Sequence, residues 1–128
     1  MKHRISLIGG NDNEVAVIIE ETANNMSHLV CKYRGKTIKS SAWDFFEAFC
    51  IIRIELEKDN LIPFCYGASL NVYPSGMARD MGAGLRAYRM RMGEDISMDS
   101  LVDIFEKGPD VIPATVARQQ YFEAWRAS

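Results

Sequence analysis

Apolar and polar residues alternate along the first forty positions, with turn residues between the runs, as is typical of antiparallel strands. Residues 4–8 are predicted to form a short strand, and a Gly-Gly-Asn-Asp-Asn turn separates them from residues 14–20. The second run, EVAVIIE, is β-branched and apolar, which predicts a buried strand that pairs with the first as a hairpin. Residues 27–33 and 36–39 flank Arg34-Gly35, which is a weaker hairpin signal.

A helix is predicted at residues 42–58, where apolar side chains recur at a spacing of about 3.6 residues. Ser40-Ser41 precede it as capping residues, and Asp44 suits the positive start of a helix. The charged residues lie mostly on the other side, so we expect this helix to lie across a sheet as the main core element. Its apolar face consists of Ala42, Phe45, Phe46, Phe49, Ile52 and Leu56.

The region 66–92 is the most sharply punctuated part of the chain. Residues 70–73 alternate as a half-buried strand does, and Pro74-Ser75-Gly76 ends that strand, because proline restricts φ and glycine admits positive φ. Gly82-Ala83-Gly84 marks a second break, after which residues 85–92 alternate again. This pattern predicts two strands joined by a bend of roughly ten residues that holds at most one turn of helix.

The last third of the chain predicts two further helices. Ser97 or Asp99 would cap a short helix through residues 101–105, which Gly108-Pro109 would end. A final helix begins near Val116. Its aromatic residues are expected to dock onto the body of the protein, and they are Tyr121, Phe122 and Trp125.

Together these elements predict one α+β domain over residues 1–128. We expect a mostly antiparallel sheet of about five or six strands, packed against one long central helix at about residues 42–58. A short helix and a C-terminal helix complete the expected fold. A chain of 128 residues is long enough to bury a core without disulfides or metals.

Composition narrows the class of protein. A formal net charge of −2 gives no global attraction to nucleic acids or to membranes, so no direct nucleic-acid or membrane partner is expected. No apolar run reaches the ~20 residues that span a bilayer. The cysteines are odd in number, widely spaced and without a C-x-x-C pair, which favours reduced thiols and a cytoplasmic location. They are Cys31, Cys50 and Cys65.

Residues that could carry out catalysis or bind a metal do not occur in the required patterns. His28 and Cys31 are three positions apart, so on a strand they face opposite sides of the sheet and cannot form a nucleophile pair. Ser75 lacks both glycines of a nucleophile elbow. Gly82-Ala83-Gly84 precedes a strand instead of opening a helix, unlike a phosphate-binding loop. We therefore expect no enzymatic activity, catalytic residue, metal or cofactor.

Charge is distributed unevenly along the chain. Residues 32–39 include four basic side chains and no acid, and a second basic set surrounds the central bend at Arg79, Arg86, Arg89 and Arg91. Such runs are often solvated faces, but an acidic segment can also select a basic partner and speed its encounter. The acidic segment, where Lys107 is the only base, contains Glu94, Asp95, Asp99, Asp103, Glu106 and Asp110.

Several short strings in the second half resemble a known class of proteins. They are LNVYPSGM at 70–77, MGAG at 81–84, VDIF at 102–105 and GPDVIPAT at 108–115. Over about residues 61–125, the chain is similar to small cytoplasmic immunity proteins encoded beside bacterial polymorphic toxins of the contact-dependent inhibition and Rhs kind. The resemblance implies a non-catalytic binder that occludes the active site or substrate surface of one toxin domain, often a nuclease.

Three hypotheses follow for the function. The first is an immunity protein that binds the C-terminal domain of its cognate toxin through the acidic residues between 94 and 110. The second is a small-molecule-binding domain or small enzyme, with a pocket where the central strands meet the bend, at Tyr73, Arg79, Tyr88 and Arg89. The third is a structural subunit of a larger assembly, which would expose an apolar patch.

Overall fold

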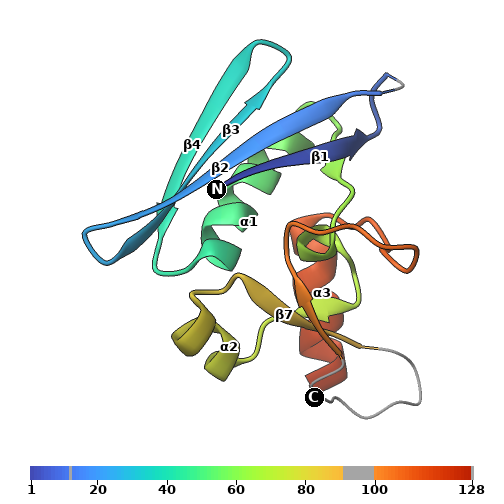
Figure 1. Cartoon of the computed structure of the whole chain (residues 1–128). Coiled ribbons are helices and arrows are strands. Elements are labelled where there is room, and N and C mark those ends of the chain that lie inside the picture. Colours follow the sequence, from blue (N-terminus) through green and yellow to red (C-terminus); the bar gives the residue numbers. More distant parts are fainter. Residues whose placement is uncertain (12, 91–99, 128) are drawn as a thin grey trace.

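Two antiparallel sheets organise the computed structural model, which describes residues 1–11, 13–90 and 100–127 (Figure 1). The larger sheet is curled and consists of β1 (Lys2–Ile8), β2 (Val15–Ala23), β3 (Met26–Tyr33), β4 (Lys36–Ala42) and β5 (Ile62–Pro63), in the order β4-β3-β2-β1-β5. The smaller sheet consists of β6 (Val72–Tyr73), β7 (Arg86–Arg89) and β8 (Leu101–Asp103). The helices are α1 (Phe45–Glu57), α2 (Gly76–Gly82) and α3 (Val116–Ala127). The predicted single α+β domain is thus confirmed, but its strands form two sheets instead of one, and the central helix is shorter than the predicted 42–58.

Tight turns join β2 to β3 and β3 to β4. Asn24 and Asn25 have φ values of 55° and 60°, and Arg34 and Gly35 have values of 49° and 71°. Positive φ at both central residues is the hairpin geometry whose twist matches that of the paired strands. Asparagine and glycine adopt it at low cost. The hairpin predicted at Arg34-Gly35 is confirmed by the pairing of β3 with β4.

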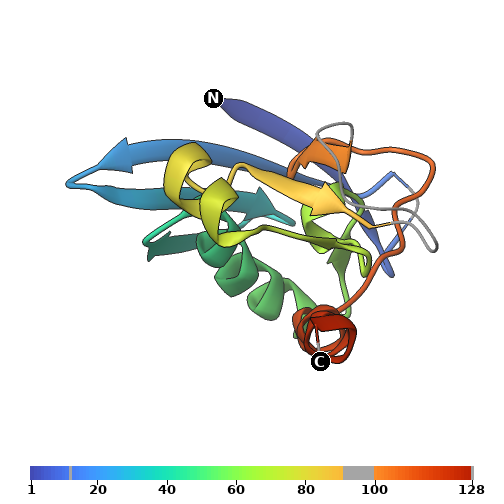
Figure 2. The same cartoon turned by 90° about the horizontal axis from the view of Figure 1, so that it is seen from below.

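Helix α1 begins one residue after Asp44, whose side chain accepts a hydrogen bond from the Glu47 N–H at 2.7 Å. The capping residue is therefore Asp44, and the predicted caps at 40–41 are wrong because both serines belong to β4. Ser40 still supports the helix, since its buried hydroxyl donates to the Ala48 carbonyl at 2.9 Å. Helix α1 covers one face of the larger sheet, and we call the other face the open face (Figure 2).

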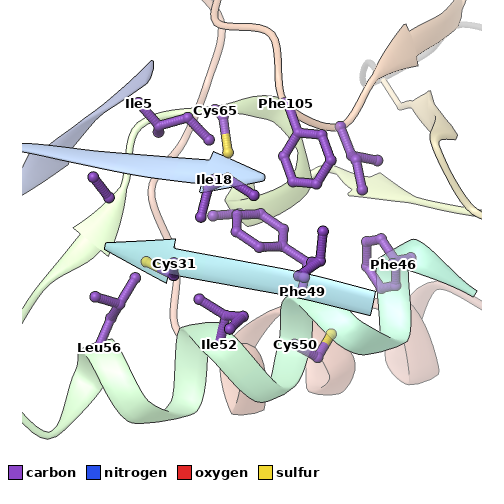
Figure 3. Close-up of a cluster of buried hydrophobic side chains, with 14 of the residues drawn as sticks. Ile5, Ile18, Cys31, Phe46, Phe49, Cys50, Ile52, Leu56, Cys65 and Phe105 are labelled. Carbon is purple, nitrogen blue, oxygen red and sulfur yellow. The ribbon is translucent and has the colours of Figure 1, made fainter. Parts of the chain in front are cut away.

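The core lies between α1 and the covered face of the sheet. Phe49 and Ile52 of α1 are 0% exposed and point toward Ile18 of β2 (Figure 3). The ring of Phe49 meets the ring of Phe105 edge-on, with centroids 5.1 Å apart. Burial of each such side chain contributes roughly 1.5–3 kcal/mol, so this layer supplies most of the cohesion of the fold.

Strand β2 is apolar on both of its faces. Ala16 and Ile18 are buried on the covered face, whereas Val15, Val17 and Ile19 alternate with them on the open face and are half-buried. The prediction of a buried strand is therefore correct for one face only.

The smaller sheet corrects two sequence predictions. Helix α2 spans seven residues instead of one turn at most, and Ser75 caps it by accepting a hydrogen bond from the Ala78 N–H at 3.1 Å. The short helix predicted at 101–105 is wrong, because residues 101–103 form β8 and pair with β7. Its expected caps, Ser97 and Asp99, lie outside the described residues. In the described part of the chain, no helix is long and apolar enough to cross a membrane.

Candidate functional site

The acidic residues predicted to bind a partner do not form one continuous exposed surface within the part of the chain that the structure describes. Glu94, Asp95 and Asp99 lie outside them. Asp103 ends β8, where its Oδ1 accepts a hydrogen bond from the Phe105 N–H at 2.9 Å. Glu106 is exposed and follows in the adjoining turn. Of the two, Asp103 already has a local structural role.

Asp110 lies at the centre of an internal cluster with Tyr66 and Arg89. The Tyr66 hydroxyl donates to Oδ1 of Asp110 at 2.8 Å, and Nε of Arg89 forms an ion pair with Oδ2 at 3.2 Å. The Arg89 guanidinium also lies 5.8 Å from the centre of the Tyr66 ring. Burial and then the hydrogen bond to Asp110 raise the pKa of Tyr66. Asp110 therefore connects its own loop to β7 and to the short 3-10 helix η1 (Tyr66–Ala68), and a partner would have to compete with these contacts.

Arg79, from the second predicted site, joins α2 to the start of α1. Its Nη1 lies 3.2 Å from Oδ2 of Asp44 and 3.6 Å from Oε2 of Glu47. Its guanidinium also lies 5.7 Å from the centre of the Tyr73 ring. The charge of Arg79 is thus already neutralised within the fold.

The four residues of that second site divide into two groups. Tyr73 and Tyr88 are directly opposite each other on β6 and β7, so their side chains share one face of the smaller sheet. Arg79 lies on that side with Tyr73. Arg89 follows Tyr88 on the strand and therefore points to the other face, where it pairs with Asp110. The two arginines and two tyrosines of the predicted pocket therefore do not all point toward one site.

A groove with a volume of ≈ 550 Å³ runs along α3. Two large aromatic side chains project beside it, with Tyr121 75% exposed and Trp125 67% exposed. The prediction that these aromatics dock onto the body is therefore wrong for both, whereas Phe122 is half-buried. Tyrosine, tryptophan and arginine contribute most of the binding energy in many protein interfaces. The groove is lined by Leu70, Ala117, Arg118, Tyr121, Phe122 and Trp125.

Buried polar contacts hold the opposite side of α3. The Val116 N–H donates to Oε2 of Glu57 on α1 at 2.9 Å, which supplies an acceptor at the helix start. Gln119 is 0% exposed and bonds to Arg53 of α1 and to three backbone carbonyls near β6. Arg53 donates further to the Ala114 carbonyl at 3.1 Å. Because these contacts fix the helix, its outer side presents Trp125 and its neighbours on a firm support.

The thiols are poorly suited to nucleophilic chemistry. All three cysteines are buried and free, as expected for reduced thiols. Burial raises the pKa of Cys31 and Cys65 to about 12 and that of Cys50 to about 11. They are protonated at neutral pH, and the thiolate is the reactive form. Among the described residues, no group of three histidine, cysteine or acidic side chains is placed to hold a metal ion.

His28 and Ser41 form a hydrogen-bonded pair on the open face. Nδ1 of His28 lies 2.6 Å from the Ser41 Oγ, and Nε2 lies 3.1 Å from the Ala23 carbonyl. A carbonyl can only accept, so Nε2 carries a proton, and in the neutral ring Nδ1 then accepts from the serine hydroxyl. A catalytic serine also needs donors for an oxyanion, and neither residue lines the α3 groove. We therefore assign the pair a structural role, in which it links β3 to β4.

Sequence reasoning missed the α3 groove because it assumed that every aromatic residue of the helix faces inward. The available signal was Gln119, which interrupts the inner side, while Arg118, Tyr121, Phe122 and Trp125 share the other side at i, i+3, i+4 and i+7 spacing. No protein-family model matches this chain, and no curated protein matches it significantly.

Proposed function

We propose that the protein is a non-enzymatic, cytoplasmic binding protein that neutralises a bacterial toxin domain, as an immunity protein does. The observation that carries this proposal is the α3 groove, where an anchored helix exposes 75% of Tyr121 and 67% of Trp125. Exposed aromatics beside an apolar groove are the usual anchors of a protein interface. The resemblance of residues 61–125 to immunity proteins supports a toxin domain as the partner.

In this proposal the acidic residues between 94 and 110 contribute less to partner binding than the sequence predicted. Glu106 is exposed, so it can meet a basic partner without the loss of an internal side-chain contact. Asp103 and Asp110 are bonded within the fold. We therefore place the main binding energy at the α3 groove and assign partner choice to Glu106 and the acidic residues at 94–99.

The experiment that tests the proposal is an affinity capture from source cells with matched variants. Wild-type protein should recover one partner at near-equal stoichiometry, identified as the C-terminal domain of a large secreted protein. The double variant Tyr121→Ala/Trp125→Ala should lose that partner, because truncation of one interface anchor weakens binding by about 2 kcal/mol or more. Trp43→Ala is the matched control, since Trp43 is 82% exposed but precedes α1.

Toxicity then separates binding from neutralisation. The recovered domain should arrest growth when it is expressed alone, and co-expression of wild-type protein should restore growth. Co-expression of Tyr121→Ala/Trp125→Ala should fail to restore it. A captured partner that is harmless would refute the immunity function, and equal capture by wild type and the double variant would refute the assignment of the groove.

A further inference from the structure

The open face of the larger sheet has an unusual composition for a surface in contact with water. Helix α1 covers the other face (Figure 2). In an antiparallel sheet that is covered on one side, the water-facing positions are normally polar. Here the water-facing positions of β2 are Val15, Val17 and Ile19, and Val30 of β3 lies beside Ile19. We call these four half-buried residues the aliphatic strip.

Strand register places basic residues on both sides of this strip. In one row, Arg4 of β1, Val17 of β2 and Lys32 of β3 lie directly opposite one another. Directly opposed residues have side chains on the same face of the sheet. Arg4 and Lys32 are both exposed, so this row has a basic residue on each side of an aliphatic one.

The neighbouring row repeats the arrangement over four strands. Lys2 and Ile19 are opposite each other on β1 and β2, and Val30 and Lys39 are opposite each other on β3 and β4. Since adjacent strands lie about 4.8 Å apart, the two lysines are separated by roughly 14 Å at the level of the backbone. The four basic residues therefore frame the aliphatic strip, and they are Lys2, Arg4, Lys32 and Lys39.

These four basic side chains form no ion pair with any residue that the structure describes. Other basic residues of the same region behave differently, since Arg34 pairs with Glu14 and Lys36 pairs with Asp59. Two carboxylates lie on or beside the face. Glu21 of β2 is on the open face itself, two residues after Ile19 and opposite His28, and Glu106 lines a cavity that Arg4 also lines. The centre of the open face is thus basic and apolar at once.

We propose that the open face is a docking surface for an acidic protein partner, whose carboxylates meet the four basic residues and whose apolar side chains cover the aliphatic strip. Complementary charge favours encounter and partner choice, and coverage of the strip removes apolar surface from water. The chemistry differs from that of the α3 groove, which is mainly apolar and aromatic. The proposal goes beyond toxin neutralisation and stands independently of it.

A protein explains this face better than a nucleic acid does. Single-stranded nucleic acids are bound by basic grooves that also present aromatic side chains for base stacking. The open-face positions of β1 to β4 carry no phenylalanine, tyrosine or tryptophan. A phosphate backbone would satisfy the charges but would leave Val17, Ile19 and Val30 uncovered.

The test uses labelled probes and matched variants of the full chain. Fluorescence anisotropy measures binding of a short helical peptide that mixes Glu and Leu on one face, and of the same peptide with Lys in place of Glu. Oligothymidine and phosphatidylserine vesicles serve as the competing polyanions. The variant Lys32→Glu/Lys39→Glu is compared with Lys58→Glu/Arg86→Glu, which has the same net charge but alters exposed residues outside the open face.

We expect the Glu-Leu peptide to bind and the Lys-Leu peptide to show no binding. Lys32→Glu/Lys39→Glu should weaken the binding about tenfold or more, whereas Lys58→Glu/Arg86→Glu should change it by less than about threefold. Ile19→Thr/Val30→Thr should also weaken it, without a change in its salt dependence. Circular dichroism confirms that each variant is folded.

Three results would overturn the proposal. One is an absence of binding by the Glu-Leu peptide at low salt. Another is equal weakening by the two charge-reversal variants, which would indicate a response to net charge alone. The third is that oligothymidine or the vesicles bind more tightly than the Glu-Leu peptide and that this binding depends on Lys32 and Lys39. That result would assign the face to nucleic acid or to a membrane surface instead.

Discussion

Nη1 of Arg53 on α1 donates a hydrogen bond to Oε1 of Gln119 on α3 at 2.7 Å, and both residues are at most 1% exposed. Among the described residues, no carboxylate lies within ion-pair distance of Arg53, and burial lowers its pKa. A buried cation needs compensation by hydrogen bonds. Here the acceptors are an amide oxygen and backbone carbonyls. Gln119 of α3 therefore helps to compensate the buried charge of Arg53 on α1, and this contact holds the two helices together.

Replacement of Gln119 by leucine should strongly destabilise the protein. Nε2 of Gln119 donates to the carbonyls of Gly67, Ser69 and Val72 at 3.1, 2.8 and 2.9 Å. Gln119→Leu would leave one Arg53 N–H and the Val72 carbonyl without their side-chain partner in the interior, and the Gly67 and Ser69 carbonyls would each lose one of two hydrogen bonds. We expect a loss of about 3–5 kcal/mol in the free energy of unfolding, measured by urea denaturation.

Gln120→Leu is the control for this substitution, because Gln120 is exposed on the same helix. It should change stability by less than about 0.5 kcal/mol. If Gln119→Leu costs under about 1 kcal/mol, the buried network does not hold α3 in solution, and the support for the groove is lost.

The elements with strong local patterns could be predicted from the sequence, and the failures have physical causes. The periodic face of α1 and the Arg34-Gly35 hairpin depend on neighbouring residues, so sequence reasoning found the hairpin and the helix face, except that Ala42 belongs to β4. Residues 101–103 have a pattern compatible with helix, but pairing with β7 makes them a strand. That pairing is a tertiary effect, which overrides local propensity.

The stability of the protein should fall as pH rises from about 9 to about 11. The pKa of Cys31 and Cys65 is about 12 in the folded state, raised by burial from an ordinary value of 9.0. Below pH 9 both states hold the thiol proton, so burial has no pH-dependent cost there. Above it, the unfolded chain loses protons that the folded chain keeps, and each thiol lowers the free energy of unfolding by up to about 1.4 kcal/mol per pH unit.

Cys65→Ala isolates one thiol, which is 0% exposed. Its plot of unfolding free energy against pH should be shallower than that of wild type in this range, even though the cavity lowers its stability at pH 7. Tyr33, whose pKa burial raises to about 12, contributes equally in both proteins. Parallel curves for wild type and Cys65→Ala would contradict the assignment.

Asp110→Asn should lower stability by about 1–3 kcal/mol, because it weakens a charged hydrogen bond from Tyr66 and the ion pair with Arg89. Glu106→Gln is the matched control on an exposed carboxylate and should be nearly neutral. Thermal unfolding distinguishes the two. Equal stability of both variants would contradict a structural role for Asp110. It would then again be a candidate for the partner binding that the acidic segment predicted.

The candidate sites show why surfaces are harder to predict than elements. The acidic run is visible in sequence, but the capture of Asp110 by Tyr66 and Arg89 requires segments that are far apart along the chain. Likewise, Lys2 and Lys39 become members of one face only through the register of four strands. A run of charged residues in the sequence therefore shows which charges a segment carries. The ion pairs and hydrogen bonds of the folded chain decide which of those charges can bind a partner.

The emission of Trp125 tests whether the α3 groove is open in solution. Trp43 and Trp125 are the two tryptophans, and they are 82% and 67% exposed. Trp43→Phe leaves Trp125 as the sole reporter, and Trp125→Phe leaves Trp43. Both folded variants should therefore emit like tryptophan in water, and each should retain wild-type stability within about 0.5 kcal/mol.

The toxin domain recovered by affinity capture should shift only the emission of Trp43→Phe to shorter wavelength, because binding removes Trp125 from water. Trp125→Phe should show no shift, since Trp43 precedes α1 and does not line the groove. Emission from Trp125 that is already short in wavelength without a partner would mean that the groove is covered. If that emission moved to longer wavelength on dilution, a second copy of this chain would be the cover, and the groove would serve self-association instead of toxin binding.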